Sequence, residues 1–250
     1  MALVVTVAQQ KGGAGKTTLV ANLAAAWAAT RRVGVLDIDP QRSLARWHAL
    51  REAHVAREDH VAREPGPGTR STGARGTGAR GAGAARAQAG AQGAAGAGLR
   101  PILCSDAAGW KLANELDRMA RGVDIILVDS APHIDTDARR AIRAAALVLV
   151  PVQPSLPDLW AAEGTMALAA AEKRPARLVM NRAPARSRLR SAVEAEAARR
   201  GWAMLTPALG SRSAYAQAFA QGMGVSETSP RSAACVELLA LVAAIEEMLP

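Results

Sequence analysis

Short, continuous apolar runs recur along the chain with little polar alternation inside them. Runs of this kind are typical of strands that are buried on both faces of a parallel sheet. Between the runs, apolar residues recur every three or four positions, as they do along one face of a helix. The pattern predicts an α/β fold in which helices flank a mostly parallel, twisted sheet. The expected strands are 3–7, 33–38, 101–104, 124–129, 145–152, 177–181 and 202–206. The expected helices include 16–30, 41–63, 158–172 and 212–222. Three more are expected: one containing Leu112 and Leu116, one that begins at Pro184 and buries Leu189, Val193 and Ala197, and a last helix through Cys235, Leu238, Val242, Ile245 and Leu249.

The segment 11–18 lies between the first expected strand and the first expected helix, and it reads Lys-Gly-Gly-Ala-Gly-Lys-Thr-Thr. Its glycines allow the backbone to wrap closely around an anion, and the loop N–H groups and the helix N-terminus direct positive partial charge at that anion. Lys16 is then placed to reach the β- and γ-phosphates, and the Thr17 hydroxyl to hold Mg²⁺. The expected nucleotide-binding residues here are Gly12, Gly13, Ala14, Gly15, Lys16, Thr17 and Thr18.

A second lysine, Lys11, opens this loop, and Gln10 stands where the strict P-loop pattern has glycine. This arrangement resembles the deviant Walker A motif of the ParA/MinD family of P-loop ATPases. The resemblance implies ATP and Mg²⁺ as cofactors, Lys11 and Lys16 as catalytic residues, and an ATP-dependent homodimer in which Lys11 reaches the partner's nucleotide. It covers nearly the whole chain outside 65–98, and it is closest to short ParA-like forms without an N-terminal helix-turn-helix domain.

Acidic residues end two of the expected strands, at the edge where parallel sheets bind their ligands. Asp37 and Asp39 belong to the sequence Asp-Ile-Asp-Pro-Gln, which resembles the second motif of the family. In that family the second acid, here Asp39, orients the attacking water, and Asp37 would lie nearer the metal. The alternative for both is a pair of turn acids that cap a helix. Asp129 ends the run 124–129 as a Walker B carboxylate and is expected to hold Mg²⁺ through a water.

Further segments also resemble elements of the family. His133, in Asp-Ser-Ala-Pro-His, is a candidate switch residue, and residues 151–155, Pro-Val-Gln-Pro-Ser, match an element expected near the dimer face. Asn181 resembles the asparagine that contacts adenine, because an amide both donates to and accepts from the base edge; the alternative is a turn residue at a strand end. Pro207 falls where the family closes over the adenine.

Residues 65–98 differ in composition from the rest of the chain. This segment contains 11 of the 22 glycines and no Val, Ile, Leu, Met, Phe, Tyr or Trp. Such a segment buries too little apolar surface to offset the entropy of ordering it. We therefore expect a disordered, low-complexity insertion within a single ParA-like domain spanning 1–250. The alternative is an Arg/Gly arm that contacts nucleic acid.

Positive charge is concentrated in two segments. The chain carries a net charge of +9, of which 65–98 contribute +4 and 172–200 contribute +6, so the remaining residues together carry −1. Clustered positive charge is typical of proteins with a polyanionic partner, and an aromatic content of 3% favours duplex phosphates over stacking on single strands. The resemblance places non-specific DNA binding on Arg182, Arg186, Arg188 and Arg190; the alternative is a solvated basic face.

Two widely separated cysteines without a CxxC motif argue against a disulfide framework or a zinc site. No apolar run approaches the ~20 residues that span a bilayer, and the N-terminus has no signal sequence. We therefore expect a cytoplasmic, nucleoid-associated protein without a membrane partner.

These features together predict a weak, partner-stimulated Mg²⁺-dependent ATP hydrolase. ATP-driven dimerisation would enable non-specific binding to double-stranded DNA, and hydrolysis would release it, so that plasmid or chromosomal DNA is segregated with a ParB-like adaptor or cargo protein. A ParA-like ATPase that positions a protein cluster, such as chemotaxis receptors, would share every motif. A MinD-type cell-division regulator would need a basic amphipathic tail, whereas the last expected helix carries Glu237, Glu246 and Glu247 on its polar side. A reductase of the nitrogenase iron-protein type would need cysteines beside the Walker B motif.

Overall fold

The fold was analysed in a computed structural model that describes residues 2–63, 99–107, 111–133, 136–184 and 187–250. The expected insertion 65–98 and Arg186 lie outside the described residues. The strands are β1 (Leu3–Val7), β2 (Val33–Asp37), β3 (Ile102–Asp106), β4 (Ile125–Asp129), β5 (Leu147–Val152), β6 (Ala176–Met180) and β7 (Met204–Leu205). The helices are α1 (Lys16–Ala28), α2 (Ser43–Arg63), α3 (Leu112–Met119), α4 (Thr136–Ala144), α5 (Leu156–Ala171), α6 (Arg188–Arg199), α7 (Ser213–Ala220), α8 (Val225–Thr228) and α9 (Ala233–Glu246).

The strands form one seven-stranded sheet in the order β3-β2-β4-β1-β5-β6-β7. Every strand pair is parallel, which confirms the predicted fold class. The central strands are buried on both faces, as their uninterrupted apolar sequences predicted. β1 lies between β4 and β5, so the loop that follows β1 begins in the middle of the carboxyl edge of the sheet.

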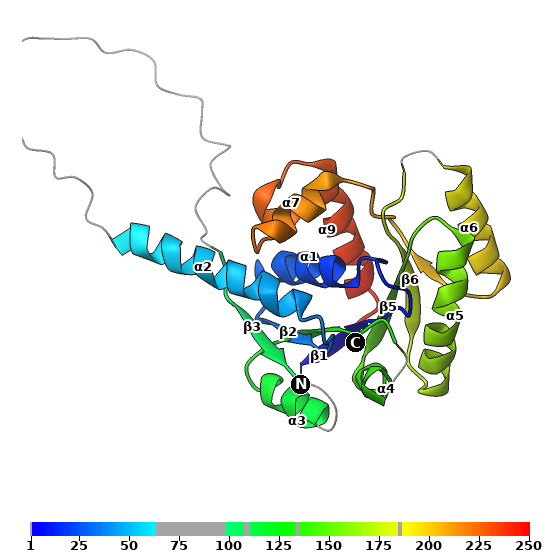
Figure 1. Ribbon diagram of the computed structural model, residues 1–250, viewed down its shortest axis with the longest axis horizontal. Coiled ribbons are helices and arrows are strands. Elements are labelled where there is room, and N and C mark those ends of the chain that lie inside the picture. The colour runs from blue at the N-terminus through cyan, green and yellow to red at the C-terminus, as the bar shows by residue number, and fades with distance from the viewer. Residues whose placement is uncertain (1, 64–98, 108–110, 134–135, 185–186) are drawn as a thin grey trace, which may run out of the picture.

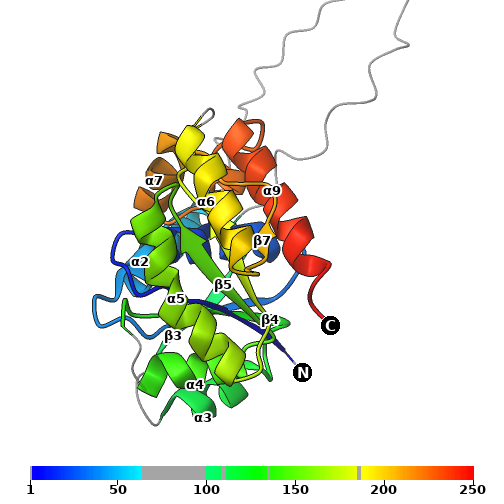
Figure 2. The same cartoon turned by 90° about the vertical axis from the view of Figure 1, so that its right-hand side faces the viewer.

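Helices cover both faces of the sheet (Figures 1 and 2). On one face, α1, α2, α7 and α9 pack against the side chains of alternate strand residues. On the other face, α3 and α4 cover the β2–β4 side, and α5 and α6 cover the β5–β6 side. Alternation within each strand explains this division: Leu127 packs toward the α1 face, whereas Ile126 and Val128 pack toward α3. The C-terminal part of α2 projects beyond the sheet (Figure 1).

The helix after β6 begins later than predicted. The Ser187 hydroxyl accepts a hydrogen bond from the backbone N–H of Arg190 at 3.4 Å, so this serine caps α6 and Pro184 lies outside the helix. Val193 and Ala197 are buried as expected, but Leu189 is 61% exposed because it lies in the first turn, before α6 packs against α5. The short helices α4 and α8 were not predicted.

A buried ion pair joins two elements that are far apart in the sequence. The Arg51 guanidinium on α2 is 1% exposed and contacts both carboxylate oxygens of Glu227 on α8, at 2.6 and 2.8 Å. It also donates to the Arg100 carbonyl oxygen at 2.8 Å and lies over the Trp47 ring. This pair fixes α2 and the segment before β3 to the C-terminal part of the fold. Among the described residues, none of the helices combines the length and apolar character needed to cross a bilayer.

Candidate functional site

The glycine-rich loop joins β1 to α1, as predicted, and two of its glycines adopt positive φ. Gly13 has φ 79° and Gly15 has φ 88°, and Gly15 is the residue that precedes the first turn of α1. The loop is also anchored from outside. The Gln153 side-chain amide donates to the Gly13 carbonyl oxygen at 3.1 Å, and the Asn181 side-chain amide donates to the Ala14 carbonyl oxygen at 2.9 Å. The segments after β5 and β6 therefore hold the loop in place.

Asn181 is buried between the loop and the end of β6. Its side-chain oxygen accepts from the Arg182 backbone N–H at 2.9 Å, so each end of the amide already has one backbone partner. A Cβ on Gly15 would lie 2.4 Å from the Asn181 amide nitrogen, so a side chain at position 15 would displace it. In this structure Asn181 joins β6 to the phosphate loop, and one amide hydrogen and one lone pair remain for a ligand.

Lys16, the first residue of α1, interacts electrostatically with Asp129, the last residue of β4. Burial lowers the pKa of the Lys16 ammonium, and the carboxylates of Asp129 and Asp39 oppose that shift. Asp129 is fully buried at the end of β4, and neither of its carboxylate oxygens forms a hydrogen bond of full geometry with a described residue, although the Thr17 hydroxyl lies near enough to lower its pKa. Burial raises the pKa of Asp129 to about 7, while the nearby Thr17 hydroxyl and Lys16 oppose the rise.

The unpartnered carboxylate of Asp129 is the observation that fits a bound cation. A buried carboxylate without donors is costly unless a metal, its water or a ligand completes it. Protein Mg²⁺ sites commonly use one or two carboxylates together with substrate phosphates and waters, which is the donor set available here. Among the residues that the structure describes, no cluster of three or more His, Cys, Asp or Glu side chains could hold a metal on its own.

Asp37 and Asp39 take different positions. Both oxygens of Asp37 accept backbone N–H groups at 3.0 Å, one from Asp39 and one from Ala45 in the first turn of α2. Burial raises the pKa of Asp37, and these N–H donors oppose the rise. Asp37 therefore orders the turn that carries Asp39, whereas Asp39 is half-buried and accepts from the Gln41 N–H at 2.9 Å.

Lys11 forms an ion pair within its own chain. Its ammonium contacts the carboxylate of Asp158, in the first turn of α5. The Asp158 carboxylate is 2% exposed and also accepts the Ser155 hydroxyl at 3.0 Å and the Gln153 backbone N–H at 3.2 Å. The Lys11 side chain remains 42% exposed, so it is held from one side and open to solvent on the other.

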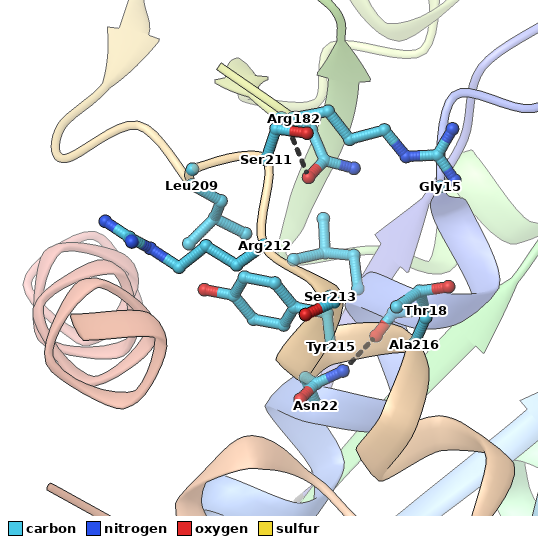
Figure 3. A pocket seen from close by; sticks show the side chains of 13 residues that line it. Gly15, Thr18, Asn22, Arg182, Leu209, Ser211, Arg212, Ser213, Tyr215 and Ala216 are labelled. Atoms are coloured by element: carbon cyan, nitrogen blue, oxygen red, sulfur yellow. Dashed lines mark hydrogen bonds between the residues drawn. The ribbon is translucent and has the colours of Figure 1, made fainter. Parts of the chain in front are cut away.

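A cavity of about 390 Å³ opens beside the N-terminus of α1. Thr18, Leu19 and Asn22 line it on the helix side, and the segment 209–216 lines it on the other (Figure 3). Pro207 does not line this cavity; the wall begins at Leu209. A cavity adjoining a phosphate loop has the position and size for a nucleoside.

Three of the predicted DNA-binding arginines lie in the part of the chain that the structure describes, in different surroundings. Arg182 lines the cavity, and its side chain extends toward Gly15 (Figure 3). Arg190 is paired with Glu194 at 2.8 Å on the same helix. Arg188 is exposed at the start of α6. The candidate switch residue His133 is exposed as well.

Sequence reasoning missed two residues of this edge. Asp106 ends β3 in register with Asp37, which in turn lies beside Asp129, so three strands end in aspartate side by side. Asp106 is paired with Arg42. The signal for Asp106 in the sequence was its position as an acidic residue just after a short expected strand, but it belongs to no motif. Asp158 follows the segment 151–155, which was singled out in the sequence, but nothing in the sequence indicated that Asp158 would form an ion pair with Lys11.

Comparison with known proteins places this geometry in a family. Residues 5–225 match the family described as the CobQ/CobB/MinD/ParA nucleotide binding domain. "Maintenance of carboxysome distribution protein A" of Halothiobacillus neapolitanus is 26% identical over 236 residues, which cover 92% of this chain and 89% of that protein.

Solved structures share the fold at low sequence identity. The cell division ATPase MinD of Pyrococcus furiosus superposes with a TM-score of 0.68 at 18% identity, covering 99% of this chain and 100% of that one. A putative plasmid partition protein of Borrelia burgdorferi B31 bound to AMPPNP gives a TM-score of 0.65 at 14% identity, covering 100% of both chains. Because the family match extends over most of the sequence, this chain belongs to the CobQ/CobB/MinD/ParA family of nucleotide-binding domains, as the deviant loop predicted.

Proposed function

We propose that this protein is a Mg²⁺-dependent ATPase whose ATP-bound form is a homodimer that binds duplex DNA non-specifically. The observation that carries the ATPase part is the unpartnered, buried carboxylate of Asp129 beside Lys16 and the phosphate loop. A Mg²⁺ ion with a triphosphate would supply the missing positive charge.

Each residue of the site has a proposed role. Lys16 neutralises the phosphates, and the Thr17 hydroxyl and Asp129 hold Mg²⁺, directly or through water. Asp39 positions the attacking water, and Asp37 keeps the Asp39 turn in place through its two backbone hydrogen bonds. Bound Mg²⁺ would stabilise charge on the phosphate oxygens, and the loop N–H groups would hold the same oxygens.

Dimerisation requires Lys11 to exchange partners. Its contact with Asp158 would give way to the triphosphate of the other protomer, which offers several negative charges in place of one. The exposed side of Lys11 makes that exchange sterically open. Hydrolysis removes one phosphate, so it weakens the intermolecular contact and shifts the population back to monomers.

DNA binding would use arginines and lysines outside the nucleotide cavity. Arg188 makes no ion pair with any described residue and remains available. A second basic group lies where α4 and α5 end side by side (Figure 2). There Arg139 and Arg143 share the single carboxylate of Glu172, at 3.7 and 2.7 Å, and two further cations follow it in the sequence, Lys173 and Arg174, both exposed.

The test is retention of a random-sequence duplex with ATP, with ADP and without nucleotide, across a salt series. We expect binding with ATP that weakens steeply as salt rises, because each neutralised phosphate releases counterions. Light scattering in parallel should report a dimer with ATP, most clearly for Asp39→Ala, which should trap the ATP state on DNA. Equal DNA binding in all three nucleotide states, or a monomer in saturating Mg²⁺-ATP, would contradict the proposal.

The same cycle could distribute a protein assembly instead of DNA. This second candidate is favoured by the similarity over 92% of the chain to a protein named for carboxysome distribution. In the host, imaging a labelled copy of this protein with a labelled plasmid or chromosomal locus would separate the two. A distribution defect confined to a protein focus, with faithful DNA inheritance in the deletion strain, would support the second candidate; a DNA segregation defect would support the first.

A further inference from the structure

One wall of the nucleotide cavity is held by a glutamate on the last long helix. The backbone N–H of Gly210 donates to Glu237 Oε2 at 3.0 Å. Arg212 Nε donates to the same oxygen at 3.0 Å, and Arg212 Nη2 donates to Oε1 at 2.5 Å. Figure 3 shows the Arg212 side chain extending out of the cavity toward the red ribbon of α9. Glu237 thus connects α9 to the wall of the cavity without facing the cavity itself.

On its inner side, the same wall continues the sheet. The Leu209 N–H donates to the Met180 carbonyl oxygen at 2.8 Å, the Ala183 N–H donates to the Leu209 carbonyl oxygen at 2.9 Å, and the Ser211 N–H donates to the Ala183 carbonyl oxygen at 3.0 Å. These bonds attach 209–211 to the segment after β6, next to Asn181. Glu237 anchors the outer side of the wall, through its contacts with Gly210 and Arg212, where the backbone hydrogen bonds to the sheet end.

The packing at this anchor is close. A Cβ on Gly210 would lie 3.0 Å from Arg212 Nε and 3.1 Å from Glu237 Oε2, so the backbone approaches the ion pair as closely as glycine allows. Arg212 lowers the pKa of Glu237, and the Gly210 N–H adds to this shift. The carboxylate therefore stays ionised around neutral pH and keeps its charge-assisted bonds.

We infer that Glu237 is a positioning residue for the base of the bound nucleotide, because it fixes the 209–212 wall of the cavity in place before the ligand arrives. The inference rests on the proposed function, since it assumes that a nucleoside occupies this cavity. A preorganised wall spares the ligand the entropy of ordering a loop, so its loss weakens binding of the base. The phosphate loop is anchored by Gln153 and Asn181 and does not depend on Glu237.

The test compares two ligands in Glu237→Gln and in wild type, by calorimetric titration of the full chain. Mg²⁺-ATP presents both the base and the phosphates, whereas Mg²⁺-tripolyphosphate presents the phosphates alone. We expect Glu237→Gln to bind ATP about tenfold more weakly, which is the loss of one charged hydrogen bond, and to bind tripolyphosphate within about twofold of wild type. In turnover, KM should rise while kcat at saturation stays unchanged, because uniform binding has been lost.

Glu247→Gln is the matched control, because Glu247 is exposed at the end of the same helix and forms no hydrogen bond or ion pair with the described residues 209–212. It should leave both affinities unchanged. Arg212→Lys keeps an ion pair but loses the forked contact, and it should shift ATP affinity in the same direction by about threefold. If Glu237→Gln is too unstable to titrate, the ATP affinity of Arg212→Lys tests the inference in its place.

An equal loss for ATP and tripolyphosphate would reduce Glu237 to a general structural role and overturn the inference. Unchanged ATP affinity in both Glu237→Gln and Arg212→Lys would overturn the inference as well. Wild-type protein that binds tripolyphosphate but not ATP would overturn the proposed function and this inference with it, so the two failures are distinguishable.

Discussion

Asp129→Asn tests the electrostatics at the centre of the site. Asparagine has the shape of the aspartate but no charge, so it removes a buried carboxylate that has no hydrogen-bond partner among the described residues. Without nucleotide and Mg²⁺, we expect this change to stabilise the fold at alkaline pH. In their presence, we expect it to abolish hydrolysis, since the metal would lose its carboxylate.

The magnitude follows from the raised pKa. Burial raises the pKa of Asp129 from an ordinary value of 3.8 to about 7, so the folded state retains a proton that the unfolded chain releases. The resulting penalty is absent below pH 3.8, grows as pH rises, and is complete above about pH 7. At ~1.4 kcal/mol per pKa unit, the full penalty is about 4 kcal/mol, of which roughly 2–3 kcal/mol develops between pH 5 and pH 8. In the variant, the Lys16 ammonium loses its favourable interaction with the Asp129 carboxylate, which makes the measured gain in the free energy of unfolding smaller.

Urea unfolding at pH 5, 6, 7 and 8 without ligands measures this effect. The free energy of unfolding of Asp129→Asn relative to wild type should rise with pH by about 2 kcal/mol. Asp106→Asn is the control, because this carboxylate also ends a strand of the same edge but is 52% exposed, and its difference from wild type should not change over this range. A difference for Asp129→Asn that is flat with pH, or a variant less stable than wild type at pH 8, would refute the reasoning.

Three further substitutions test other contacts. Gly15→Ala should weaken ATP binding at least tenfold by titration, because a Cβ there collides with the Asn181 amide and φ is 88°; wild-type affinity would contradict the geometry. Arg51→Ala should lower the free energy of unfolding by ~3–5 kcal/mol, because it leaves Glu227 without its buried partner, and a loss below ~1 kcal/mol in denaturant titration would show that the pair is dispensable. Lys11→Ala should retain ATP binding by one protomer but abolish the ATP-dependent dimer in light scattering; a dimer of unchanged affinity would remove Lys11 from the interface.

The sheet was predictable because its strands are nearly all buried on both faces. Such strands are continuous apolar runs, and their carboxyl ends can be read directly from Asp37 and Asp129. The helices were predictable where their apolar stripe is long, as in α1 and α9. α4 is short and rich in charge, and although Ala138, Ala141 and Ile142 are buried at helical spacing, Ile142 is the only large apolar side chain among them, so the helix was not recognised.

The candidate site was predictable where one segment supplies both the backbone geometry and the side chain, as in the phosphate loop. It was not predictable where the partner comes from a distant segment. Glu237 lies 27 residues from Gly210 in the chain, and Asp158 lies 147 residues from Lys11. The residues that hold the loops carry no motif of their own, because any acidic side chain brought to that point by the fold would serve.

Lys11 illustrates how the fold changes the meaning of a motif. As a sequence feature it is a free cation, available to a second molecule, but in the folded chain it already neutralises Asp158, a buried carboxylate whose other donors are a hydroxyl and a backbone N–H. When Lys11 leaves, Asp158 keeps the Ser155 hydroxyl and the Gln153 backbone N–H as donors, whereas a triphosphate offers Lys11 several negative charges in place of one. Lys11 would therefore move to the partner's nucleotide when one is bound and return to Asp158 when it is not. The dimer would then depend on nucleotide because the same cation has a weaker alternative partner within its own chain.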